Sequence, residues 1–265
     1  MKTSITVCQV PEAANGPFVL RAPLAEAFAM AANIGFDAVE LFLPGPDTIS
    51  IEEVKSLAAT HGLAIAAVGT GAGMLQRGLT ITDASPKIRE AAINFIFSMI
   101  DFGGQLGAPA ILGSMQGMRS HPAALNQLSD GLRRCGERAA VHGVTFIYEP
   151  LNRYETNLFN RLEDAVEFLK QHQLENVFLL ADLFHMNIEE KDIPAAIRKA
   201  GKHIGHVHFA DSNRQAMGYG HTPAAPVIEA LFEIQYSGYL SAEIFPLPDP
   251  ESAARQTIAT IRALS

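Results

Sequence analysis

A regular alternation of short apolar runs with longer helical patterns extends along the whole chain and constrains its fold more than any other feature. The apolar runs lack period-two alternation, which is typical of strands buried on both faces of a parallel sheet. We expect β-strands at residues 4–10, 37–42, 63–69, 109–113, 144–149, 177–182, 203–209 and 239–244. We expect helices at residues 22–34, 50–61, 86–106, 121–142, 161–173, 192–201, 223–236 and 250–263. Eight strand–helix repeats in 265 residues predict an α/β protein with one (β/α)8 TIM-barrel domain, residues 1–265.

Several helix boundaries carry signals of their own. Ser50 and Asp249 each precede a helical stretch and are expected N-caps. Glycines that follow a helical stretch are expected to adopt the left-handed conformation that ends a helix. These glycines are Gly35, Gly62, Gly107, Gly143 and Gly201.

The composition argues against several classes of protein. The net charge is −8 and Lys and Arg form no run, which argues against binding to nucleic acid. The longest apolar stretches are interrupted by charge or by Gly-Pro, so we expect no transmembrane helix. The first residues show no apolar region followed by a small-residue cleavage site, so we expect no secretion. The two cysteines, Cys8 and Cys135, suit a reducing compartment without disulfides. We therefore expect a cytoplasmic protein without a nucleic-acid or membrane partner.

Four consecutive apolar runs in the second half of the chain each end on an acid or an imidazole. The carboxyl ends of successive barrel strands meet at one mouth, where barrel enzymes place their chemistry. Three carboxylates cannot crowd together in ionised form unless a cation lies among them or protons are shared, and oxygen ligands with one imidazole suit Mn²⁺, Mg²⁺ or Co²⁺. A single acid at a strand end is usually a solvated loop residue, but the common position of all four predicts a metal site. Its expected ligands are Glu149, Asp182, His208 and Glu243.

Polar side chains near these ends are candidates for binding substrate. His206 alternates with His208, so both are expected to point into the barrel, with His206 as a buried, hydrogen-bonded residue behind the ligand. His185 and Arg214 suit the stabilisation of an oxyanion, and Glu155 suits a substrate hydroxyl. Arg214 and Glu155 also fit a surface ion pair. The glycines of residues 217–222 suit either a backbone cradle for a ligand such as a phosphate or a plain flexible loop.

Three segments carry a family resemblance. Residues 149–155 (Glu-Pro-Leu-Asn-Arg-Tyr-Glu), 182–190 (Asp-Leu-Phe-His-Met-Asn-Ile-Glu-Glu) and 204–214 (Ile-Gly-His-Val-His-Phe-Ala-Asp-Ser-Asn-Arg) resemble the xylose-isomerase-like TIM-barrel superfamily. The resemblance is closest to its sugar isomerase/epimerase branch, which includes D-tagatose and D-psicose 3-epimerases. It implies that the four predicted ligands bind Mn²⁺, with Co²⁺, Mg²⁺ or Zn²⁺ as alternatives, and that Glu155, His185 and Arg214 contact the sugar.

The chain also departs from this branch. It has no Trp, which such epimerases often place around the sugar, so we expect Phe184, Phe245 or Tyr154 to take that place. Met217 replaces the proline of a common Pro-Gly-x-Gly loop, and Pro223 stands where relatives often carry an acid. These departures concern the identity of the substrate more than the chemistry.

The resemblance implies a metal-dependent sugar isomerase or epimerase that works through a cis-enediolate, first of all a ketose 3-epimerase. Inversion at C3 needs two proton-transfer groups on opposite faces, and Glu149 and Glu243 are the candidates. The alternatives are a hydroxypyruvate-isomerase-type aldose–ketose isomerase and an inosose-type dehydratase, and outside this chemistry a sugar-binding barrel. An endonuclease-IV-like repair enzyme would need more metal ligands and basic loops. We expect a sugar or sugar phosphate as partner, and a homodimer or homotetramer.

Overall fold

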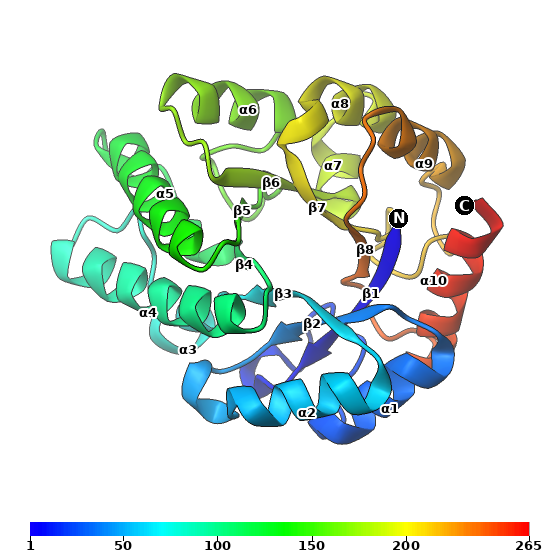
Figure 1. Cartoon of the computed structure of the whole chain (residues 1–265). Coiled ribbons are helices and arrows are strands. Elements are labelled where there is room, and N and C mark those ends of the chain that lie inside the picture. Colours follow the sequence, from blue (N-terminus) through cyan, green and yellow to red (C-terminus); the bar gives the residue numbers. More distant parts are fainter. Residues whose placement is uncertain (265) are drawn as a thin grey trace.

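The computed structural model describes residues 1–264 and shows a closed barrel of eight parallel strands, each hydrogen-bonded to the next along the chain (Figure 1). The strands are β1 (Lys2–Cys8), β2 (Ala38–Phe42), β3 (Ala64–Gly69), β4 (Ala110–Leu112), β5 (Phe146–Tyr148), β6 (Val177–Asp182), β7 (Ile204–His208) and β8 (Tyr239–Ala242). β8 closes the barrel against β1, with Ser241 opposite Ser4. The prediction of a (β/α)8 barrel is confirmed.

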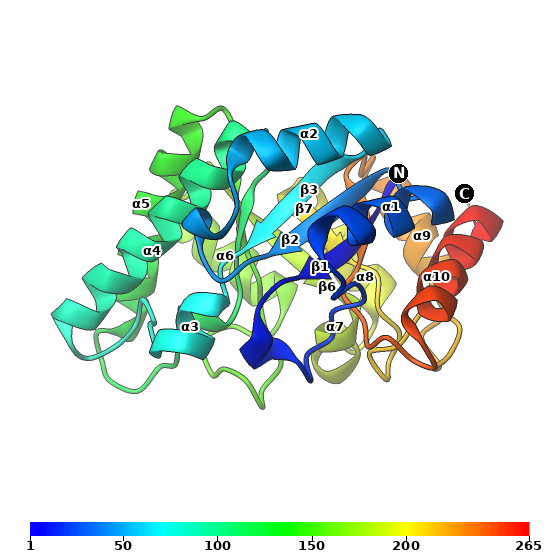
Figure 2. The ribbon, with the colours of Figure 1, turned by 90° about the horizontal axis from the view of Figure 1, so that it is seen from below.

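Every predicted helix is found in the ring around the barrel, with ends that differ by a few residues. These helices are α1 (Leu24–Ile34), α2 (Ile51–His61), α4 (Pro86–Gln105), α5 (Ala124–Val141), α6 (Leu162–Gln171), α8 (Ile193–Ala200), α9 (Ala224–Glu233) and α10 (Pro250–Leu264). Two short helices, α3 (Ala72–Arg77) and α7 (Leu183–Glu189), were not predicted. Single 3-10 turns occur at Pro11–Ala13, Pro46–Thr48, Ser114–Gln116 and Gly201–His203. Figure 2 shows α3 and α7 at the same rim of the barrel.

The helix boundaries follow the sequence signals. The Ser50 side chain accepts a hydrogen bond from the Glu53 backbone N–H at 3.1 Å, and Asp249 caps α10 through the Ser252 N–H at 2.9 Å. All five predicted glycines have a positive φ, between 54° and 100°. Gly35 and Gly62 end α1 and α2 in the left-handed conformation, whereas Gly201 ends α8 with a ψ of −129°, outside that conformation. Over residues 1–264, no helix is long and apolar enough to cross a membrane.

The core lies mainly between the strands and the helix ring, where Phe28, Ile96 and Phe146 are fully buried. A second, smaller hydrophobic cluster consists of the buried residues Ala67, Ile111, Ile147 and Leu180. Because Ile111 also lines the cavity described below, this cluster forms part of the cavity floor. The polar residues at the C-terminal ends of the strands therefore rest on an apolar layer.

Candidate active site

The structure brings the four predicted metal ligands together around His208. Asp182 is the last residue of β6 and His208 the last of β7, whereas Glu149 and Glu243 directly follow β5 and β8. The His208 Nδ1 atom lies 3.2 Å from Asp182 Oδ2, 3.5 Å from Glu243 Oε2 and 3.8 Å from Glu149 Oε1. Glu149, Asp182 and His208 form a group with the spacing of a metal site. Glu243 is not in this group, and its contact to the group is the 3.5 Å between its Oε2 atom and His208 Nδ1.

The pKa values of Glu149 and Asp182 are shifted in opposite directions. Burial, together with the negative charges of Glu243 and Asp182, raises the pKa of Glu149 well above its ordinary value. The Glu149 Oε1 atom is buried and has no hydrogen-bond partner among the described residues. Burial would also raise the pKa of Asp182, but the His185 and His208 imidazoles and the Arg214 guanidinium hold it below its usual range. A partnerless carboxylate oxygen among like charges is where a proton or a cation is needed.

The pKa of His208 is set by the acids that surround its ring. Burial alone would lower its pKa, but the carboxylates of Glu243, Glu40 and Asp182 raise it well above the ordinary value. Its Nε2 atom lies 3.2 Å from Glu40 Oε1, on the side away from the other carboxylates. The imidazole therefore lies between Glu40 on its Nε2 side and Asp182 and Glu243 on its Nδ1 side.

Arg214 is part of this site and does not form a surface ion pair. Its guanidinium lies 2.5 Å from Glu243 Oε2 and 4.8 Å from the centre of the Phe184 ring. Its backbone has a φ of 58°, and the Arg214 carbonyl accepts a hydrogen bond from the Phe245 N–H at 2.8 Å. The surface alternative is thus wrong for Arg214, because the loop after β7 turns the side chain toward the barrel.

His185 is held in one tautomer. Asp182 Oδ1 caps α7 by accepting hydrogen bonds from the backbone N–H groups of Phe184 and His185, which places the His185 side chain in the cavity. The backbone N–H of Asn152 donates to His185 Nδ1, and the Asn152 side chain contacts the same atom at 2.8 Å. Nδ1 is therefore an acceptor, so the proton lies on Nε2, a buried atom without a hydrogen-bond partner within residues 1–264. Burial lowers the pKa of His185, which keeps it a neutral donor.

A cavity of about 300 Å³ opens above these residues. Glu155, which accepts a hydrogen bond from the Asn152 side chain at 3.0 Å, lines it together with His185 and Arg214. Residues of the segment after β1 also line the cavity, and no motif had singled out this segment. It contributes Glu12, Asn15 and Phe18.

The aromatic wall differs from the prediction. Phe184, Phe245 and Tyr154 do not line the cavity, and Tyr154 is 82% exposed. The cavity is lined instead by Phe18 and Phe42, whose rings stack with centroids 4.5 Å apart. Phe18 lies in a loop with no recognisable motif, so nothing in the sequence singled it out.

The backbone N–H groups of the glycine-rich residues 217–222 bind a carboxylate of the protein itself and not a ligand, and these contacts hold the loop in place. The Asp211 carboxylate accepts hydrogen bonds from the backbone N–H groups of Gly218, Gly220 and Thr222 at 2.7–2.9 Å. Because an internal carboxylate already occupies these donors, they are not available to a phosphate. The same contacts fix the loop beside Arg214.

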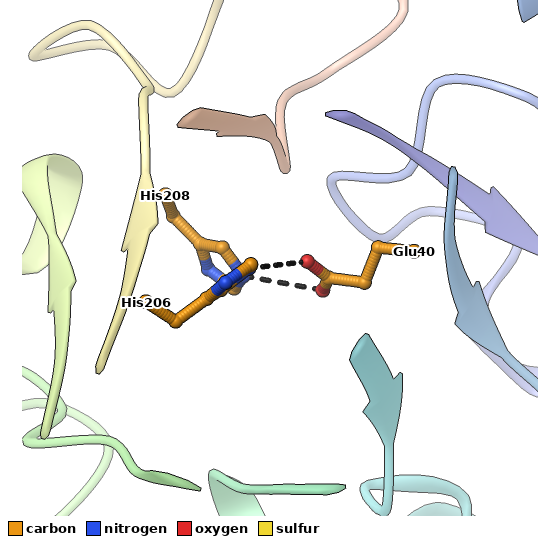
Figure 3. A group of neighbouring side chains, drawn as sticks. All are labelled: Glu40, His206 and His208. Atoms are coloured by element: carbon orange, nitrogen blue, oxygen red, sulfur yellow. Dashed lines mark hydrogen bonds and ion pairs between the residues drawn. The ribbon is translucent and has the colours of Figure 1, made fainter. Parts of the chain in front are cut away.

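Glu40 on β2 is another polar residue of the site that sequence reasoning missed. It is 5% exposed and contacts both His206 and His208 (Figure 3). The expectation of a buried, hydrogen-bonded His206 is confirmed. An acid within an otherwise apolar strand was the available signal, because a buried charge requires a partner.

Comparisons with known proteins agree with this architecture. Residues 28–264 match the family model of the xylose isomerase-like TIM barrel. The chain is 33% identical to a D-psicose 3-epimerase of Ruminiclostridium cellulolyticum, over 81% of this chain and 75% of the relative. It is 31% identical to a 3-dehydro-D-guloside 4-epimerase of Escherichia coli, over 89% and 93%. The crystal structure of a D-psicose 3-epimerase with D-tagatose from Clostridium cellulolyticum superimposes with a TM-score of 0.83 at 25% identity, over 100% and 99% of the two chains.

Proposed function

Because the chain belongs to the xylose isomerase-like TIM barrel family, we propose that it is a metal-dependent ketose 3-epimerase that works through a cis-enediolate. The observation that carries the proposal is the cluster of Glu149, Asp182, Glu243 and His208 at the floor of a sugar-sized cavity. The ketose 3-epimerases among the relatives support the reaction, and the two glutamates support its stereochemistry.

The donor set fits one divalent cation. Three carboxylates and one imidazole, with a partnerless oxygen on Glu149, match the preferences of Mn²⁺, and Co²⁺, Mg²⁺ or Zn²⁺ are alternatives. When bound, such an ion polarises the substrate carbonyl and acidifies the neighbouring C–H bond.

Different residues would transfer protons and bind the substrate oxygens. Glu149 follows β5 and Glu243 follows β8, with β6 and β7 between them. They would exchange protons with opposite faces of C3, one removing a proton and the other returning one. The Nε2–H of His185 donates to a substrate oxygen as negative charge develops on it. Arg214 holds Glu243 in place, and Glu155 accepts a hydrogen bond from a sugar hydroxyl.

The cavity favours a sugar without a phosphate. Its lining includes the acids Glu12 and Glu155 in addition to the proposed ligands. The arginine that lines it, Arg214, is already paired with Glu243. A phosphate would therefore meet carboxylates without a free arginine or lysine among the lining residues, whereas neutral hydroxyls pair well with carboxylates. Phe18 and Phe42 supply an apolar surface for the C–H face of a sugar.

A 4-epimerase of 3-keto sugars is the second candidate. The E. coli 3-dehydro-D-guloside 4-epimerase matches nearly the full length of both chains. Its named reaction also inverts a carbon next to a carbonyl, so the same residues could serve it. The expectations of a cytoplasmic location, a homodimer or homotetramer, and no nucleic-acid or membrane partner remain part of the proposal.

The test is incubation of the Mn²⁺-loaded chain with free ketoses and a 3-keto-glycoside in deuterated water, followed by NMR. We expect D-fructose, D-psicose, D-tagatose or L-ribulose to gain deuterium at C3 and to give the C3 epimer. Deuterium at C4 of the 3-keto-glycoside alone would favour the second candidate. An aldose product would indicate an aldose–ketose isomerase, and loss of water a dehydratase. Binding of the sugar without any exchange would favour a sugar-binding barrel.

A further inference from the structure

Glu40 is a buried acid that the proposed mechanism does not use. It lies on β2, whereas the proposed metal ligands lie on or just after β5 to β8. Figure 3 shows its side chain pointing into the barrel toward the two histidines of β7. A carboxylate in this position loses its hydration, so its contacts must compensate for the burial.

Both oxygens of Glu40 contact imidazole nitrogens. Oε2 lies 2.8 Å from His206 Nε2, and Oε1 lies 3.2 Å from His208 Nε2. An ionised carboxylate only accepts hydrogen bonds, so each Nε2 atom must carry a proton. The two rings are nearly perpendicular, at 84°, which lets each approach a different oxygen.

The proton on His208 Nε2 determines what the other ring nitrogen can do. In a neutral imidazole, Nδ1 is then left with a lone pair. That atom faces Asp182 at 3.2 Å and Glu243 at 3.5 Å, in the space proposed for the ion. Partners that hold the second nitrogen of a ligating histidine fix its tautomer and ring orientation.

The backbone of β7 also contributes to this arrangement. The register with β6 slips by one residue, so that Leu179 pairs with Ile204 and Leu180 with His206. Gly205 is the extra residue, and a Cβ atom there would lie 2.7 Å from the Phe178 Cβ, which only glycine avoids. A bulge of this kind re-aims the side chains that follow it. Here, those side chains are the two histidines.

We propose that Glu40 is a positioning residue: it holds the proton of His208 on Nε2 and thereby directs Nδ1 to the divalent cation, while His206 holds Glu40 in this orientation. The proposal rests on the proposed function, because it takes His208 as a ligand. Glu40, His206 and His208 are also close enough to form a second cation site. Contacts of 2.8 and 3.2 Å are the lengths of direct hydrogen bonds and favour the positioning role.

The first experiment is a calorimetric titration of the metal-free chain with Mn²⁺, for the wild type, Glu40→Gln and Glu12→Gln. A glutamine offers one acceptor oxygen for two imidazoles, so we expect Glu40→Gln to bind Mn²⁺ about 10- to 100-fold more weakly. Glu12→Gln is the matched control. It removes one charge from the same cavity, and Glu12 bonds to Gln76. We expect wild-type affinity for this control.

Three results of the titration would overturn the positioning role. The first is unchanged affinity in Glu40→Gln. The second is an equal loss in Glu12→Gln, which would indicate a general effect of charge. The third is two equivalents of Mn²⁺ in the wild type with one lost in Glu40→Gln, which would indicate a second cation site.

A second measurement needs no variant of Glu40 and stands even if that variant does not fold. Long-range ¹H–¹⁵N NMR of the Mg²⁺-loaded wild type should show the His208 proton on Nε2, with the signal assigned by its loss in His208→Asn. A proton on Nδ1 would overturn the proposal. If the Mn²⁺ affinity falls in Glu40→Gln but the wild-type chain epimerises no sugar, the proposed function alone would be overturned. Full affinity in Glu40→Gln with epimerisation intact would overturn the positioning role alone.

Discussion

At the scale of single residues, Glu149 and Glu243 have different surroundings. Glu243 accepts a hydrogen bond from Arg214, whereas Glu149 Oε1 is buried without a partner. Glu149→Gln and Glu243→Gln each keep an oxygen that can contact a cation but cannot carry a proton at neutral pH. We expect each variant to retain part of its Mn²⁺ affinity and to lose about 10²–10⁴-fold in epimerisation rate. Turnover at saturating Mn²⁺ is the measurement.

Isotope exchange shows which glutamate serves which face of C3. In deuterated water, a variant that exchanges the C3 hydrogen without inverting C3 retains the base on one face, so the replaced glutamate serves the other face. Wild-type epimerisation in either variant with metal bound would contradict the two-carboxylate mechanism.

His185 offers a separate prediction, because its Nε2–H is a donor fixed by Asn152. His185→Ala should lower kcat by about a hundred- to a thousand-fold, which is typical for loss of one donor to a developing oxyanion. The Mn²⁺ affinity should fall less than kcat. Asn152→Ala should give a smaller loss of kcat, since it removes the side-chain contact to Nδ1 but keeps the backbone N–H donor and the imidazole. Equal kcat in wild type and His185→Ala would make His185 an ordinary polar residue of the cavity.

The sequence predicted those residues of the site that end a strand. Glu149, Asp182, His208 and Glu243 were found because strand ends converge in any such barrel. Glu40 was missed because it lies within β2 and not at a strand end, although an acid in an otherwise apolar run was a signal for a buried partner. Phe18 was missed because the path of a loop depends on tertiary contacts, here the Arg21 guanidinium bonded to the Ala13 and Gly16 carbonyls.

At the scale of elements, the long helices were predictable and the short ones were not. The helices of the ring span two or more turns with an apolar face, and glycine ends several of them. α3 and α7 have six and seven residues, which is too short for a helical period to be recognised. Asp182 is the N-cap of α7, and its other oxygen faces His208, so one residue both caps a helix and belongs to the site.

The neighbouring helices α4 and α5 provide a prediction about pH. Asp101 of α4 accepts a hydrogen bond from Arg138 Nε at 2.6 Å and contacts His142 Nε2 at 2.9 Å. The Arg138 guanidinium, with a smaller effect of His142, lowers the pKa of Asp101. A lowered carboxyl pKa stabilises the fold above the unfolded value of about 3.9, and this contribution is lost as pH falls through the folded value.

Asp101→Asn should therefore lower the free energy of unfolding by about 0.5–1 kcal/mol at pH 7, and the difference should shrink toward pH 3. Urea unfolding at several pH values measures this. Asp130→Asn is the control, because Asp130 pairs with Arg133 within α5 and both side chains are half exposed. We expect it to have a smaller effect. A difference for Asp101→Asn that persists unchanged at pH 3 would exclude the carboxylate pairing as its cause.

At the scale of the whole molecule, the site exists only when the barrel is closed. Glu40 comes from β2 and the proposed ligands from the ends of β5 to β8, so no single strand–helix unit contains the site. An ion bound there would connect several strands in the folded state, and the unfolded chain would hold it weakly. Binding of the ion should therefore stabilise the entire fold.

Mn²⁺ at about 100 times its Kd should stabilise the folded chain by about 2.7 kcal/mol. For a chain of this size, this corresponds to a rise in Tm of about 5–10 °C. Differential scanning fluorimetry with and without Mn²⁺ measures the shift, and excess EDTA should reverse it. Glu149→Gln should show a smaller shift at the same Mn²⁺ concentration, because a neutral amide replaces one of the three carboxylates. A wild-type Tm that responds neither to Mn²⁺, Co²⁺, Mg²⁺ or Zn²⁺ nor to EDTA would mean that no ion is held among these strands. The convergent acids would then have to share protons, which is the other way for a buried cluster of this charge to persist.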